Sequence, residues 1–552
     1  MNMNKILKFS AILLGAAVVA TGCIKEPMPT GSGVIQDQVS ESPFAFSGIA
    51  SSIPTALITN YLGFGEHIDH GFPGLMGSLD RLVGDVFPAC WYAGGNQYYD
   101  RYQAYMYNVG MSETGSGPYF FWKSYYQFIK STNDLLSITE GVDTEDAKMY
   151  CGLGKTFRAM YYLDLCRLFD ALPAKVEKNS YDVERVKGLT VPWVDYNTTQ
   201  DMSVNNPRMT RQEAFTKIFD DLNAAEIYLA EYDQTTKALP SLACVYGLKA
   251  RAYLWLGGFD EVLEGIPTGV EAYKKAAEYA RKAITTSGAN IMSKAEWTDP
   301  KTGFNTTVSA WMWSMIQTTD TVLNNLLSFT AHNAIEAQWG YGFLAQPGLP
   351  KYAYERLSNT DFRKLLIKGE ETTYEAMKPY TNLTKADWET VAPYAFFKFR
   401  PAGGEMLSYT TGNVTDIPLM RVEEMYFIEA EATAHYDEGA ARNLLTTFMA
   451  NRDSEYKIPA TISSLVDEII FQKRIEFWGE GIVYYDMKRL NMGINNGYDG
   501  SNAPAGARWT TNGRAPWWNL VIPQSETSQN AACDAYNNPN PQDTYDSHDE
   551  NI

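Results

Sequence analysis

The chain has 552 residues and a formal net charge of −19, from 46 basic and 65 acidic side chains. Such an acidic chain repels polyanions, which argues against nucleic acid as a partner. Hydrophobic residues make up 45% of the sequence and charged residues 20%, which supplies a large core and argues against a polytopic membrane protein. The six cysteines include no CxxC pair, which excludes a small domain held by disulfides.

The N-terminus has the pattern of a targeting sequence. Two lysines and no acid precede an uncharged apolar stretch at 9–20, which is typical of a secretory signal and too short to span a bilayer. Small residues then lead to Cys23, an arrangement that resembles a bacterial lipobox. We predict a lipoprotein signal peptide over 1–22, lipidation of Cys23 and a lipid-anchored linker over 23–42. The alternative is a secreted protein with a cysteine there by chance.

Apolar side chains recur at three- and four-residue steps through much of residues 43–530, which predicts a helical body. The expected helices cover about 119–138, 144–169, 210–225, 241–256, 271–286, 419–435, 438–450 and 463–478. Thr210 and Glu213 have the spacing of a capping box. Paired helices with alanines at crossing points resemble tetratricopeptide pairs without the strict 34-residue period. The predicted fold is therefore mainly α, a tetratricopeptide-like helical-pair scaffold.

Two regions differ from this helical pattern. Residues 291–400 scatter tryptophans among Gly, Pro, Asn and Thr, which predicts a loop-rich ligand-binding insertion with a short strand at 310–316. Residues 531–552 are rich in Asn, Asp and Pro and bury little apolar surface. We therefore expect a flexible C-terminal tail after a body that covers residues 43–530.

The most specific motifs lie in the C-terminal half. They are PLMRVEEMYFIEAEA at 418–432, IFQKRIEFWGEG at 470–481, YDMKRL at 485–490 and IPQSE at 522–526, with further matches at 154–173, 249–255 and 361–363. Together they resemble the SusD/RagB family of bacterial nutrient-binding lipoproteins over nearly the whole mature chain. Two positions depart from the family pattern, namely Lys473 and the Ile482-Val483 pair.

Charged residues alternate within these motifs. Arg421, Arg474 and Arg489 interleave with Glu424, Glu476 and Glu480. On facing helices such residues can form a partly buried network in which every charge is paired. We interpret these residues as structural rather than catalytic.

The resemblance implies a surface-facing outer-membrane lipoprotein that sits as a lid over a SusC-like TonB-dependent transporter. Its expected function is to capture a nutrient, with an oligosaccharide or glycan as the first choice of ligand, and to deliver it to that transporter. Two alternatives stay open: a peptide-binding, RagB-like uptake lipoprotein, and a helical scaffold lipoprotein without ligand binding. No GxSxG motif is present, and we expect no enzymatic activity.

A glycan site needs flat aromatic rings beside polar groups, because sugar rings expose apolar C–H faces next to hydroxyls. Trp91, Tyr92 and Asn96 share one Gly-rich loop, and Trp339 and Tyr341 share a second. These five residues are the predicted ligand contacts. The alternative is that the rings pin loops onto the helical body, which we favour for Trp311 and Trp313 of the expected strand.

Other motifs give no site. The GKT sequence at 154–156 lacks the first glycine of a P-loop and falls inside an expected helix. His67 and His70 form the only close histidine pair and have no zinc spacing. We predict no cofactor and no catalytic metal; a structural calcium ion near 499–502 stays possible without specific ligand spacing.

Overall fold

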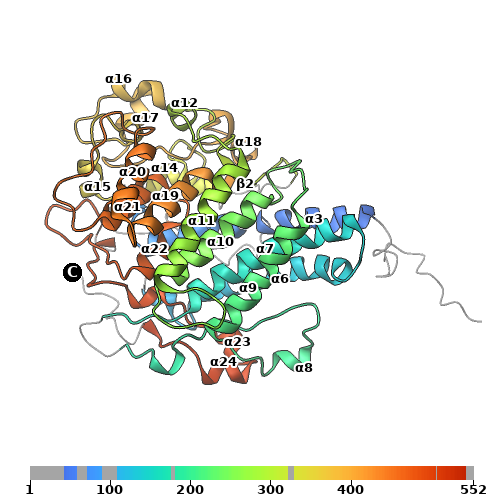
Figure 1. The fold of residues 1–552 in the computed structure, drawn as a ribbon. Helices are drawn as coiled ribbons and strands as arrows, with labels where there is room; N and C mark the ends of the chain where they lie inside the picture. The colour runs from blue at the N-terminus through green and yellow to red at the C-terminus, as the bar shows by residue number, and fades with distance from the viewer. Residues whose placement is uncertain are drawn as a thin grey trace, which may run out of the picture.

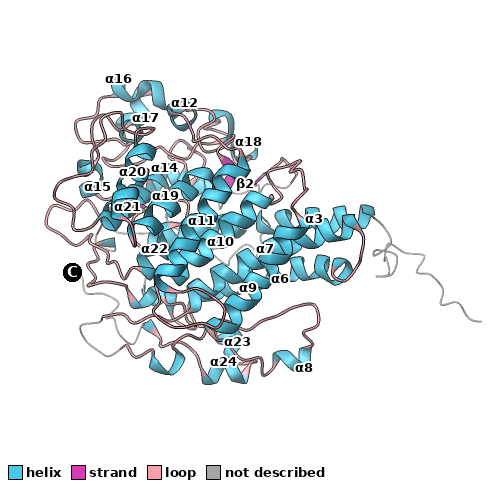
Figure 2. Cartoon of the chain, viewed as in Figure 1, coloured by secondary structure: helices cyan, strands magenta, loops and turns pink. Residues whose placement is uncertain are grey.

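The computed structural model describes residues 43–58, 71–89, 108–175, 181–320, 328–504 and 507–541. Helices dominate these ranges, which confirms the predicted mainly α class (Figures 1 and 2). None of the helices within them is both long and apolar enough to cross a membrane. The long helices lie together at the centre of Figure 1, and the short elements of 291–412 gather around its upper end.

The central helices pack in sequence order on one another. They are α6 (Ser116–Thr139), α7 (Glu145–Phe169), α9 (Arg211–Tyr228), α10 (Leu242–Leu256) and α11 (Gly269–Ser287). Helix α7 contacts both α6 and α9, and α10 contacts α9 and α11. Ala276 and Ala280 are fully buried on α11, where their small side chains allow close approach of the neighbouring helices.

Local signals set several ends of these helices, and the predicted capping box at Thr210 is confirmed. The Thr144 hydroxyl accepts a hydrogen bond from the Ala147 N–H and so caps α7. Thr210 and Glu213 form the reciprocal bonds of a capping box at α9. Gly288 ends α11 in the left-handed conformation, with φ of 59°. Such caps satisfy backbone groups that have no partner within the helix.

The C-terminal helices carry the motif residues. They are α19 (Val422–Ala434), α20 (Glu438–Met449), α21 (Leu465–Glu476) and α22 (Val483–Arg489). The helix predicted from residue 419 begins only at Val422, because Ile417–Arg421 form strand β4, antiparallel to β2 (Trp311–Met315). All five residues of β2 are buried, rather than one face as predicted. Trp313 packs edge-on against Phe157 of α7, with ring centroids 4.9 Å apart.

The remaining elements are short, apart from two N-terminal helices. The helices among them are α3 (Pro43–Ile58), α4 (Gly71–Leu82), α8 (Gln200–Ser203), α12 (Lys294–Thr298), α13 (Phe329–Asn333), α14 (Tyr341–Ala345), α15 (Lys351–Arg356), α16 (Tyr374–Met377), α17 (Lys385–Glu389), α18 (Tyr409–Gly412), α23 (Gln524–Thr527) and α24 (Ala531–Ala535). Strand β1 (Phe87–Pro88) pairs with β3 (Pro347–Gly348). One continuous apolar core joins the N- and C-terminal halves.

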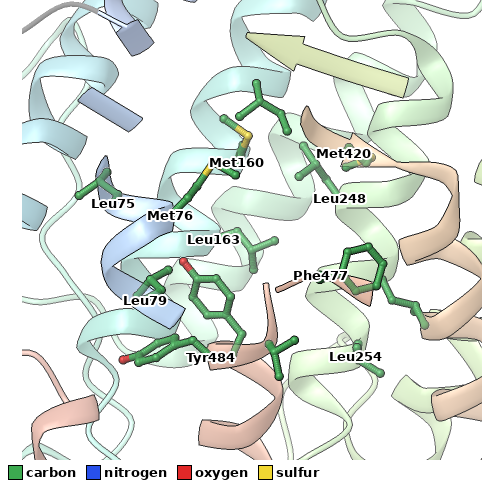
Figure 3. Packing of buried hydrophobic residues seen from close by; sticks show 14 of the residues in the cluster. Leu75, Met76, Leu79, Met160, Leu163, Leu248, Leu254, Met420, Phe477 and Tyr484 are labelled. Carbon is green, nitrogen blue, oxygen red and sulfur yellow. The ribbon is translucent and has the colours of Figure 1, made fainter. Parts of the chain in front are cut away.

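Figure 3 shows that core where distant segments meet. Leu75 and Met76 come from α4, Met160 from α7, Leu248 from α10, and Met420 from β4. All five side chains are buried. Because these residues span most of the described chain, the scaffold and the short elements fold as one packed body.

Residues 531–541, which the sequence assigned to a flexible tail, are held against the body. Cys533 of α24 is fully buried, and the Asn538 side-chain amide donates hydrogen bonds to the carbonyl oxygens of Phe169 and Leu520. Arg208 also donates to the Asn538 side chain. Residues 531–541 therefore pack on the body, because their asparagines satisfy buried backbone groups although they contribute little apolar surface.

A buried charge network lies between α21 and the segments around it. The Glu476 carboxylate pairs with Arg452 at 2.9 Å, with Arg421 at 3.3 Å and with Arg363 at 3.3 Å. All four side chains are fully buried. Burial alone would raise the pKa of Glu476, but Arg452 and the other two guanidiniums outweigh it and lower that pKa.

The predicted network is correct for Arg421, Glu476 and Glu480, since Arg421 also pairs with Glu480 at 2.9 Å. The other predicted members have different partners. Glu424 pairs with Arg251 at 2.6 Å, Arg474 with Asp85, and Arg489 with Glu431 and Asp486. Among these partners, Arg251 and Asp85 lie outside the C-terminal motifs, whereas Glu431 and Asp486 lie within them. Glu424 and Arg489 are buried, whereas the Arg474 side chain is 17% exposed, so the expected partial burial is correct for Arg474 only.

Substitution of Glu476 tests this network. We expect Glu476→Gln to lower the free energy of unfolding by about 3–5 kcal/mol, because it leaves three buried guanidiniums without their shared carboxylate. Glu278→Gln, which removes an exposed carboxylate paired with Lys275 and Lys282 on α11, is the control and should change it by less than about 0.5 kcal/mol. Chemical denaturation measures both. Equal losses of unfolding free energy in Glu476→Gln and Glu278→Gln would contradict the assignment of Glu476 as the shared carboxylate of the network.

A second prediction concerns acid stability. Burial raises the pKa of Glu431, but Arg489 and Lys473 outweigh burial and lower that pKa from 4.5 to about 2. Glu431 therefore contributes stability that is complete above pH 4.5 and is lost as the pH falls toward 2. This contribution falls by about 2 kcal/mol between pH 7 and pH 3. Glu431→Gln should destabilise the protein less at pH 3 than at pH 7, as measured by denaturant unfolding. A loss of unfolding free energy in Glu431→Gln that is the same at pH 3 and pH 7 would contradict this prediction.

Candidate functional site

Trp339 lies in the turn between α13 and α14 and is half-buried. Its indole Nε1 donates a hydrogen bond to the Glu405 carbonyl oxygen at 3.3 Å. A Cβ on Gly412 would lie 3.0 Å from the indole ring. Residues 405–412 therefore hold one edge of the indole ring, and Trp339 as a residue stays partly exposed to solvent.

A buried ion pair fixes the base of this turn. The Glu336 carboxylate lies 2.9 Å from the Arg400 guanidinium, and both side chains are fully buried. The same carboxylate accepts hydrogen bonds of 2.6 Å from the Thr381 hydroxyl and the Asn382 N–H. Since Glu336 precedes Trp339 by three residues, this pair restricts where the indole can move.

Tyr341, the second predicted residue of this loop, begins α14 and is half-buried. Its ring centroid lies 5.2 Å from that of His332 in α13. We call Trp339 and Tyr341 the aromatic platform. Both residues are partly exposed, whereas a fully buried aromatic residue could not contact a sugar.

Ala89, the last described residue before the first predicted loop, is bonded to the residue that follows α14. The Ala89 N–H, which follows β1, donates to the Gln346 carbonyl at 2.9 Å, and β1 pairs with β3 just after α14. The predicted contacts Trp91, Tyr92 and Asn96 follow in the next segment of the sequence. Those three residues lie outside the described residues, as does Cys23.

Backbone strain gathers at the same place. Gln346 and Tyr394 have φ of 50° and 68°, in the left-handed region that side chains other than glycine rarely adopt. The Gln346 side chain accepts from the Ala392 N–H at 2.7 Å, which joins the two strained segments. Burial and the nearby Glu370 carboxylate raise the pKa of Tyr394 to about 12, so its hydroxyl stays a donor to Glu370. Strain of this kind concentrates at binding sites.

Most of the other tryptophans of the loop-rich region belong to the core. Trp297, Trp311, Trp313 and Trp388 are buried, as are the late Trp517 and Trp518. Trp518 donates its indole hydrogen to the Leu82 carbonyl at 2.7 Å. The packing interpretation is therefore correct for Trp311 and Trp313, and Trp339 differs from them by its exposure.

The rejected motifs have structural roles. The GKT sequence lies inside α7, where Lys155 pairs with Glu140 at 2.7 Å and Asp221 at 3.1 Å. The Asn502 side chain bonds the backbone of Leu349 and Lys351. In the part of the chain that the structure describes, no group of three or more His, Cys, Asp or Glu side chains could hold a metal ion.

Sequence reasoning missed two residues beside the platform. Leu407 and Tyr409 lie in the segment that holds Trp339, and their side chains are exposed. Neither belongs to a periodic apolar pattern, and the segment around them is polar. Only its contact with Trp339 shows that this segment adjoins the platform.

These features define a mainly helical protein in which a half-buried tryptophan and tyrosine lie on an internally bonded support. The sequence matches the family model "SusD family" over residues 281–549 and the model "Starch-binding associating with outer membrane" over residues 95–254. The chain belongs to the SusD/RagB family. No curated protein matches the sequence.

Solved structures share this fold at low sequence identity. A SusD-like carbohydrate binding protein from Bacteroides vulgatus is 19% identical, with a TM-score of 0.66 over 89% of this chain and 97% of that one. A SusD superfamily protein from Bacteroides thetaiotaomicron is 18% identical, with a TM-score of 0.64 over 90% and 100%. Surface glycan-binding protein A from the same organism, in complex with laminarihexaose, is 17% identical, with a TM-score of 0.60 over 88% and 98%.

The close approach at β3 yields a prediction. A Cβ on Gly348 would lie 2.7 Å from the Tyr394 carbonyl oxygen and 2.9 Å from Ala89 Cβ. Gly348→Ala should therefore lower the free energy of unfolding by about 1–3 kcal/mol. In α20 a Cβ on Gly439 would meet no atom closer than 3.6 Å, so Gly439→Ala should raise it by about 0.5 kcal/mol. Denaturant titration measures the free energy of unfolding of both variants. An unchanged free energy in Gly348→Ala would show that β1 and β3 can move apart without loss of stability.

Proposed function

We propose that this protein captures an oligosaccharide at the cell surface and delivers it to a SusC-like TonB-dependent transporter. It acts as a binding protein without catalytic activity. The observation that carries the proposal is the aromatic platform, in which the Trp339 indole is held at its edge by the Glu405 carbonyl oxygen while the residue stays partly exposed. An indole fixed in this way offers an apolar face to a sugar ring at little cost in side-chain entropy.

Family membership supports the same ligand class. Among the proteins of the same fold, one is described as a carbohydrate binding protein and another is in complex with laminarihexaose. One matching family model is described as starch-binding. The proposed ligand is therefore a neutral oligosaccharide such as a glucan.

The membrane and transporter parts rest on the sequence and the family. The lipobox-like residues before Cys23 support a lipid anchor, which would keep the helical body at the outer membrane. The family model described as starch-binding is also described as associating with the outer membrane. In this arrangement ligand bound at the platform passes to the transporter below.

Calorimetry on the purified full chain in detergent tests ligand binding, with laminarihexaose and a starch-derived hexasaccharide as probes. Trp339→Ala should weaken binding roughly tenfold or more, because the ring that stacks on the sugar is lost. Tyr536→Ala is the control, since this exposed tyrosine follows α24 at the other end of the molecule (Figure 1) and should leave affinity unchanged. Binding of peptides but no glycan would favour the peptide-uptake alternative, and binding of neither would favour the scaffold.

A further inference from the structure

The segment beside the platform exposes apolar surface that the fold does not use. Leu407 is 75% exposed and Tyr409 is 40% exposed. We call residues 405–412 the platform turn. Single exposed apolar residues are ordinary on protein surfaces, but here two of them share one short turn that touches a half-buried tryptophan.

The platform turn is held in shape by its own hydrogen bonds. The Glu405 carboxylate accepts from the N–H groups of Leu407 at 2.7 Å and Ser408 at 3.1 Å. The Gly412 N–H donates to the Ser408 carbonyl at 2.9 Å. Buried Asn413 then anchors the end of α18, since its side-chain oxygen accepts from the Ser328 hydroxyl. The exposed side chains are therefore presented by an ordered backbone, and little entropy is lost when a ligand covers them.

The turn continues the platform in space. Gly412 packs directly against the Trp339 ring, as the 3.0 Å approach of a Cβ at that position indicates. Tyr409 lies three residues earlier in α18, and positions with that spacing lie about 5–6 Å apart on one helix face. Tyr409 therefore lies on the same short turn that holds the edge of Trp339 at Glu405 and Gly412, and one extended ligand can reach both residues.

The chemistry of the turn fits a neutral sugar. The Ser408 and Thr410 hydroxyls lie 2.7 Å apart on either side of Tyr409. Such hydroxyls can exchange hydrogen bonds with sugar hydroxyls while the ring contacts a C–H face. Glu405 is the only charged residue in the turn, so nothing within it attracts an anionic ligand.

We infer that Tyr409, with Leu407 beside it, forms a second sugar-contacting subsite that extends the platform and binds the next residues of a longer oligosaccharide. This inference rests on the proposed function, because it assigns the same ligand class to a neighbouring surface. It predicts selectivity for chain length: a disaccharide is held at Trp339 alone, and a hexasaccharide also covers the turn.

The test compares a disaccharide with a hexasaccharide of whichever glucan the wild-type full chain binds, by calorimetry. Tyr409→Ala should weaken hexasaccharide binding about fivefold and leave disaccharide binding unchanged. Tyr409→Phe should keep full affinity if ring stacking is the main contact, and it also guards against a folding defect. Tyr436→Ala, which removes an exposed tyrosine just after α19, is the matched control and should bind like the wild type.

Equal affinities of wild type and Tyr409→Ala for the hexasaccharide would overturn the subsite. An equal loss for both ligand lengths would also overturn it, because Tyr409 would then belong to the primary platform. If the wild type binds neither ligand, the proposed function itself fails. A loss of all glycan binding in Trp339→Ala, with no effect of Tyr409→Ala, would keep the proposed function and reject only the extension.

Discussion

The structure depends on one buried carboxylate, Glu476, which pairs with three guanidiniums from separate parts of the chain. Arg363 comes from the loop-rich region, Arg421 from the end of β4, and Arg452 from just after α20. A charge inside a protein is tolerated only when it is paired, so the fold is complete only when all four segments meet. Apolar packing of helices could be satisfied in several ways, but this charge arrangement has few alternatives.

The charge network around Glu476 is linked along the chain to the base of the aromatic platform. The buried Lys398 ammonium donates to Glu480 at 2.6 Å, and Glu480 also pairs with Arg421. Two residues further along the chain, Arg400 pairs with Glu336, which precedes Trp339 by three residues. A short stretch of backbone thus connects the charges of the helical core to the base of the aromatic platform. The position of the indole is therefore set by the fold as a whole and not by its own loop.

Sequence patterns predicted which kinds of interaction occur, such as helix caps and buried ion pairs, better than they predicted which residues pair. Helix caps such as Thr144 and Thr210 depend on neighbouring residues, so they could be predicted from the sequence. Arg251 and Glu424 are 173 positions apart, and Arg474 and Asp85 are 389 apart, so motif spacing held no information about either pair. The tryptophans present the same difficulty. Trp313 lies in an apolar stretch that favoured its burial, but the residues around Trp339 do not show that this residue stays partly exposed, which only the tertiary fold decides.

Rigidity has a direct consequence for a protein that binds and releases a ligand. Because Trp339 and the turn that carries Tyr409 are held by internal hydrogen bonds, binding requires little ordering of the protein. Each ring adds only a modest contact energy, so affinity accumulates along the ligand instead of residing in one deep pocket. A surface built in this way favours long chains and releases short ones readily. That balance suits a protein proposed to pass its ligand onward rather than retain it.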